Sequence, residues 1–122
     1  MVNARDIIIT PFSGRNLATN PYLPFYKSIK RLIYNQGDDG ELLLDILTQV
    51  EGWGAETFAS AQLAELVRQY PRAAEFNRVV MPVLLNHIIG NAKAMVEYGA
   101  ENGFDAWRRL YHHYLPLAAD LQ

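Results

Sequence analysis

Histidine is the residue of this sequence with the broadest chemistry, because imidazole can bind a metal ion or carry a proton near neutral pH. The three histidines are His87 and the adjacent pair His112 and His113. Neighbouring residues on a helix point about 100° apart, so the pair cannot chelate one metal ion as residues four positions apart can. The sequence also has no cysteine and no glutamate-flanked histidine pair. We therefore expect no metal site and no bound cofactor.

Carboxylates and serines are the other groups that could support catalysis. Asp38 and Asp39 are adjacent, and Glu41 and Asp45 lie about one helical turn apart. Acid–base catalysis needs carboxyl groups in an apolar cleft, whereas these fall at a predicted helix start, where they can act as caps, or on a polar face. The sequence also lacks a Gly-x-Ser-x-Gly nucleophile motif and the glycine patterns of nucleotide-binding loops. It therefore predicts a protein that is not an enzyme.

Basic residues near aromatic ones could instead contact RNA or a protein partner. One such group is Lys27, Lys30 and Arg31, and a second is Arg108 with Arg109. Helical spacing places these cations off the apolar stripes, as on any solvated helix face, so RNA binding through the first group is only a secondary hypothesis. The net charge of −2 also makes the overall attraction to nucleic acid or anionic lipid weak.

Trp53 stands apart from the other aromatic residues because Gly52 and Gly54 flank it. A large aromatic side chain in a glycine-flanked loop can anchor a partner protein, or it can lie over the core of its own domain. The sequence leaves both alternatives open for Trp53.

Helices must position these side chains, since apolar residues recur at helical spacing along most of the chain. With 122 residues, 50% of them hydrophobic, the chain can bury one ordinary core. We expect an all-α fold: a single compact domain of five to six helices with a short extended N-terminal arm and loop at 1–20. The predicted helices cover 21–36, 40–51, 55–70, 71–98 and 102–116. The fourth would be the longest, with a kink or break at Pro82 and an interruption or close packing at Gly90.

The segment 102–116 is the best-specified helix. Asn102 can cap its first free amides, and Asp105 favours its positive end. Pro116 is expected to end it. The residues expected to form its core-facing signature are Phe104, Trp107, Leu110, Tyr111 and Tyr114.

Three pieces of the sequence resemble the capsid region of a retrotransposon Gag polyprotein. They are Phe-Ser-Gly at 12–14 ahead of an aromatic-rich helix, the long helical segment 74–96, and the segment 102–110 with Tyr114 and Pro116. In that family, a motif similar to Gly-Phe-Glu-Ala-Trp-Arg-Arg-Leu, followed by Tyr and Pro, closes the N-terminal capsid domain. Here Asp105 stands in place of the glutamate.

The resemblance implies a domain, here 21–116, that forms a homo-oligomeric capsid lattice around the RNA of the element. It also implies that 117–122 begin a linker to a second helical domain, and that subunit contacts involve residues 2–10 and the first two helices. RNA would bind mainly through regions outside this sequence, because the zinc knuckle of the family needs cysteines.

The alternative function is a monomeric helical adaptor that binds a partner peptide or helix in an apolar groove. For either function we expect an intracellular, cytoplasmic protein without a membrane-spanning segment, because the longest apolar run, at 79–85, is far too short to cross a bilayer.

Overall fold

The computed structural model describes residues 9–35, 39–53 and 60–120, and these fold almost entirely into α-helices. The six helices of this part of the chain are α1 (Tyr22–Tyr34), α2 (Gly40–Glu51), α3 (Ser60–Gln69), α4 (Ala73–Leu85), α5 (Gly90–Gly99) and α6 (Gly103–Asp120). The described residues contain no strand beyond a single isolated bridge. The prediction of a compact all-α fold is confirmed.

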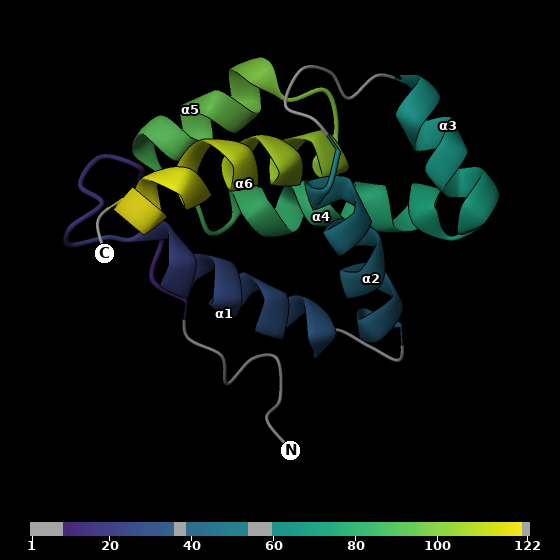
Figure 1. Cartoon of the computed structure of the whole chain (residues 1–122), viewed down its shortest axis with the longest axis horizontal. Helices are drawn as coiled ribbons and strands as arrows, with labels where there is room; N and C mark the ends of the chain where they lie inside the picture. The colour runs from purple at the N-terminus through teal and green to yellow at the C-terminus, as the bar shows by residue number, and fades with distance from the viewer. Residues whose placement is uncertain (1–8, 36–38, 54–59, 121–122) are drawn as a thin grey trace.

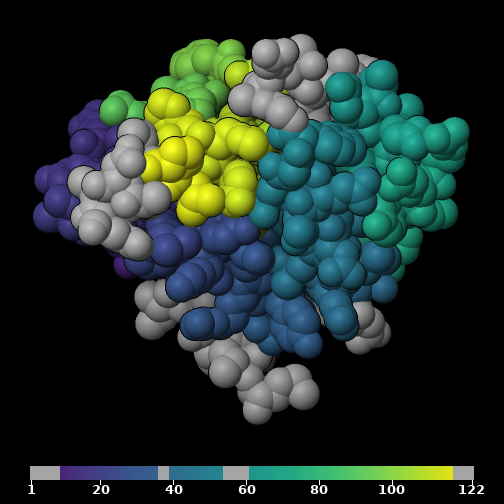
Figure 2. Space-filling view, in the orientation of Figure 1, coloured from purple at the N-terminus to yellow at the C-terminus, as the bar shows by residue number. Residues whose placement is uncertain are grey.

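Helix α6 is the centre of the domain. In Figure 1 it crosses the middle of the molecule with α5 above it and α1 below it, and it contacts α1, α2, α4 and α5. All residues from 103 to 108 are buried, so the first turns of α6 are enclosed on every side and not along a single stripe. Part of the later turns reaches the surface between α5 and α1, as Figure 2 shows.

Gly103 explains how α6 packs so closely against α4. A Cβ atom at this position would collide with the backbone carbonyl oxygen of Asn77. Since any larger residue would push the two helices apart, glycine is the only residue that permits this approach. The side chain of Asn77 then accepts a hydrogen bond from the backbone amide of Phe104, at 2.9 Å.

The segment predicted as one long helix at 71–98 is divided into α4 and α5, and it is not the longest helix described. Phe12 inserts between them in a short parallel bridge: its amide donates to the His87 carbonyl at 3.0 Å, and its carbonyl accepts from the Ile89 amide at 2.9 Å. Gly90 then opens α5 with a φ of +56°, so the interruption predicted at Gly90 is confirmed. Of the kink or break predicted at Pro82, the break is wrong, because Pro82 lies inside α4, where the loss of one amide is tolerated.

The end predicted for the last helix at Pro116 is also wrong. Helix α6 continues through Pro116 to Asp120, so 117–120 extend the helix where the sequence predicted the start of a linker. A proline inside a helix removes one backbone donor but does not by itself force the chain to stop.

Some sequence predictions lie outside the described residues, including the arm at 1–8, the start of the third helix at 55 and the last residues 121–122. Among the residues that are described, no helix combines the length and the apolar character needed to cross a membrane.

Candidate functional site

The basic group predicted on the first helix lies on the outside of α1. Lys27 and Arg31 are exposed and Lys30 is partly exposed, with its ammonium 4.9 Å from the centre of the Tyr26 ring. This is a cation–π geometry on a solvated surface. Trp53 is partly buried and packs against the hydrophobic core, so most of its side chain covers the domain.

The predicted core signature of α6 divides into two classes. Phe104, Trp107, Leu110 and Tyr114 are at most 3% exposed and belong to the core. Tyr111 is only partly buried and stacks at a tilt against Tyr26, with 5.7 Å between ring centres. Tyr111 therefore borders the core and leaves an edge at the surface.

Glu51, at the end of α2, forms a buried polar site that the sequence did not predict. Its Oε2 atom accepts hydrogen bonds from the Tyr26 hydroxyl at 2.6 Å and from the Trp107 indole N–H at 2.8 Å. Its backbone carbonyl lies 2.9 Å from His112 Nε2, which must carry the proton because a carbonyl oxygen only accepts. This single residue therefore joins α2 to α1 and α6.

The phenols around Glu51 are held in their protonated form. Burial raises the pKa of Tyr26, and its hydrogen bond to Glu51 raises it further. Burial also raises the pKa of Tyr22 well above its usual value, and the nearby Tyr26 adds to this effect. A phenol with a raised pKa keeps its proton, so it can donate a hydrogen bond but is a poor general base. Tyr26 therefore stays a hydrogen-bond donor to Glu51 and links α1 to α2.

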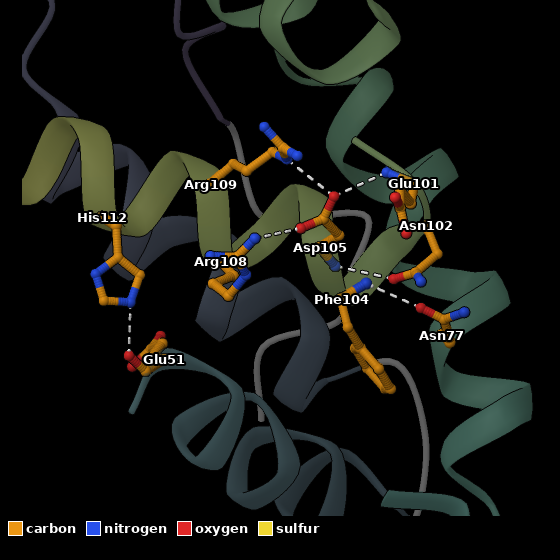
Figure 3. Close-up of polar contacts among 9 residues, drawn as sticks. All are labelled: Glu51, Asn77, Glu101, Asn102, Phe104, Asp105, Arg108, Arg109 and His112. Carbon is orange, nitrogen blue, oxygen red and sulfur yellow. Dashed lines mark hydrogen bonds and ion pairs between the residues drawn. The ribbon is translucent and has the colours of Figure 1, made fainter. Parts of the chain in front are cut away.

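Asp105, at the start of α6, forms a second buried polar site (Figure 3). The predicted cap is confirmed, because Asn102 Oδ1 accepts from the Asp105 amide at 2.9 Å. Asp105 Oδ2 accepts from the Glu101 amide at 2.8 Å and from Arg109 Nε at 2.9 Å, and Oδ1 accepts from Arg108 Nη2 at 2.7 Å. Burial alone would raise the pKa of Asp105, but these donors outweigh it and lower the pKa.

Arg108 contradicts the prediction that the cations of α6 lie on a solvated face. Its side chain is 1% exposed, as is that of its partner Asp105. A buried guanidinium is stable when a carboxylate neutralises it and fixes its geometry. Arg108 is thus part of the interior. Arg109, one position further along, has a side chain that is 39% exposed.

The remaining candidate carboxylates lie on or near α2. Glu41 and Asp45 are exposed on α2, and Asp38 lies outside the described residues. Asp38 or Asp39 was expected as a cap, and of the two Asp39 makes no capping hydrogen bond and pairs with Arg72. Asp39 pairs with Arg72, just before α4, because the guanidinium carries a full charge. A backbone amide, which Asp39 would accept from as a cap, is uncharged.

The histidines do not converge on a metal site. His87 lies in the break after α4, and burial lowers its pKa. His113 is exposed and its ring meets that of Tyr114 edge-on at 4.6 Å. In the part of the chain that the structure describes, no three His, Asp or Glu side chains are placed to hold a metal ion.

Two surface pockets among the described residues are further candidate sites. A pocket of about 200 Å³ is lined by Thr10, Thr19, Asn20, Pro21, Pro24, Phe25 and Ser28. A pocket of about 370 Å³ between α5 and α6 is lined by Met95, Arg108, Arg109, His112 and His113. The sequence did not predict the second pocket, because Arg108, one of its lining residues, was expected on a solvated face.

No protein-family model, curated protein or solved structure matches this chain. The function is therefore argued from the geometry and from the residues that carry the sequence resemblance.

Proposed function

We propose that this chain is a structural self-assembly module like the N-terminal capsid domain of a retrotransposon Gag, which forms a shell around RNA with further copies of itself. The observation that carries the proposal is the structural role of the motif at 102–110. Its Asn102 caps the helix, its glycine sets the approach to α4, its Asp105 pairs with both arginines, and its Trp107 fills the core. Such interlocking roles give a physical reason for these residues to occur together.

The polar groups of the interior support a structural module over an enzyme. Glu51 Oε2 accepts from Tyr26 and Trp107, and both carboxylate oxygens of Asp105 accept from protein donors. A catalytic carboxylate has to face a substrate, so buried carboxylates that accept hydrogen bonds inside the fold favour a role in stability.

Large apolar side chains on the outside support contacts with other copies. Tyr98 on α5 is 88% exposed, Tyr34 at the end of α1 is 54% exposed and Ile89 is 49% exposed. Tyr and other large apolar residues supply much of the energy at protein interfaces. A closed assembly needs only modest contacts of this kind, because symmetry repeats each of them many times.

Sedimentation velocity over a wide range of protein concentration tests the proposal. We expect dimers or larger species to grow with concentration, and Tyr98→Ser to reduce that growth by removing an exposed aromatic ring. Glu97→Gln, at the exposed neighbouring position, is the matched control and should associate like the wild type. A chain that stays monomeric throughout would contradict the proposal and favour the adaptor.

A further inference from the structure

The pocket between α5 and α6 has a predominantly basic lining. Four of its five described lining residues, Arg108, Arg109, His112 and His113, carry basic side chains, and the fifth is Met95. Among these lining residues there is no carboxylate. The concentration of basic groups is local, since the whole chain has a net charge of −2.

Arg109 is the residue of this pocket best placed to meet a ligand. Its Nε donates to Asp105 at 2.9 Å, which fixes one edge of the guanidinium, while the side chain remains 39% exposed. Its Nη1 reaches towards α5, where a Cβ atom on Gly99 would lie 3.6 Å away. A guanidinium held at one edge loses little rotamer entropy when its other donors bind an anion.

The neighbouring groups provide a rigid frame for Arg109. The Arg108 guanidinium is fixed by Asp105 at 2.7 Å, and the His112 ring is fixed by the Glu51 carbonyl at 2.9 Å. Figure 3 shows both side chains on the same stretch of α6 as Arg109. Because these groups are already ordered, a ligand would not have to assemble the site as it binds.

We propose that this pocket binds a phosphate group, supplied either by a free phosphate compound or by the backbone of RNA. Phosphate matches the donor geometry of arginine, which offers parallel N–H groups to two oxygens of one anion. The volume of about 370 Å³ falls in the range of small-ligand sites. The test of this site measures ligand affinity and does not depend on the oligomeric state.

Isothermal titration with pyrophosphate tests the site. Arg109→Gln should lower the affinity about tenfold or more, the effect of losing one charge-assisted contact. Its control is Lys93→Gln, which removes a cation on α5 that does not line the pocket and should leave the affinity unchanged. Wild-type protein that fails to bind millimolar pyrophosphate, or equal affinities for the two variants, would overturn the proposal.

Arg109→Gln could destabilise the fold by leaving Asp105 with fewer hydrogen-bond donors. A second pair of variants, which adds a negative charge instead of removing a positive one, tests the site independently. His113→Glu places a carboxylate at the exposed edge of the pocket and should lower the affinity for pyrophosphate about tenfold. Asn91→Glu adds the same charge at an exposed position of α5 outside the pocket and should have no effect. Equal affinities for these two variants would also overturn the site.

A fluorescence anisotropy titration with a single-stranded RNA oligonucleotide identifies the source of the phosphate. RNA that binds the wild type, binds Arg109→Gln less tightly and is displaced by pyrophosphate would assign the site to backbone phosphates. Pyrophosphate binding without competition from RNA would assign it to a free phosphate compound. Binding of neither would overturn the proposal.

Discussion

The two buried carboxylates at α6, Asp105 and Glu51, are held by contrasting sets of donors. The Asp105 carboxylate receives hydrogen bonds from groups at most four positions away, including two guanidinium groups. Glu51 receives them from an uncharged hydroxyl 25 positions away and an uncharged indole 56 positions away. The first network organises the start of one helix, and the second joins three helices.

The difference shows how one helix can be fixed in two ways. A local network of charges sets where α6 begins and holds Arg108 in the interior. A long-range pair of hydrogen bonds from uncharged donors to Glu51 sets where α6 lies against α1 and α2. Loss of the hydrogen bonds to Glu51 should therefore disturb tertiary packing. A change in the network of Asp105 should appear mainly as a dependence of stability on pH.

Trp107→Ala should have the largest effect, because it removes the hydrogen bond to Glu51 and also leaves a cavity in the core. Trp107 is 2% exposed and donates to Glu51, so its loss should lower the free energy of unfolding by about 3 to 5 kcal/mol. Urea unfolding followed by far-ultraviolet circular dichroism measures this. Tyr98→Ala is the control and should change the free energy by less than about 0.5 kcal/mol. Equal stabilities of the two variants would contradict the core role.

Glu51→Gln should have the next largest effect. An amide oxygen in the place of Oε2 can still accept from both Tyr26 and Trp107, but the two bonds lose the charge of the carboxylate, so the free energy of unfolding should fall by about 1 kcal/mol. Glu41→Gln makes the same change at an exposed position of the same helix and should be nearly neutral. A neutral Glu51→Gln would mean that the charge of Glu51 does not strengthen these two hydrogen bonds.

The smallest effect is expected in the acid dependence of stability. The pKa of Asp105 is lower in the folded than in the unfolded chain, so its carboxylate stabilises the fold above the ordinary pKa near 3.8 and loses this contribution as pH falls through the folded value. Urea unfolding should therefore show that the free energy of unfolding falls more between pH 6 and pH 3 for the wild type than for Asp105→Asn. An equal fall in both proteins would contradict the role of Asp105.

The same contrast explains how much of the structure the sequence could predict. Helices α1 and α2 and the cap of α6 depend on local spacing, and the sequence predicted them. Asp105 was predicted at the positive end of its helix because its capping partner Asn102 is only three positions away. Glu51 was missed because no local pattern connects it with Tyr26 or Trp107.

Long-range contacts also account for the other errors. Arg108 carries a charge that usually marks a solvated face, and only the packing of neighbouring helices around the start of α6 buries it. The pairing of Phe12 with the segment between α4 and α5 was missed, because the two segments lie far apart along the chain. The basic pocket was missed for the same reason, since it needs both α5 and the buried Arg108.

The central claim is that α6 holds the fold together while self-assembly uses the outer surface. Sedimentation velocity of Trp107→Phe, beside the wild type and under conditions where both are folded, tests it most directly. Phenylalanine keeps an aromatic ring in the core but cannot donate to Glu51. We predict that the folded variant associates with the same concentration dependence as the wild type. A folded variant that stays monomeric where the wild type associates would contradict the claim and place Trp107 in the assembly contact.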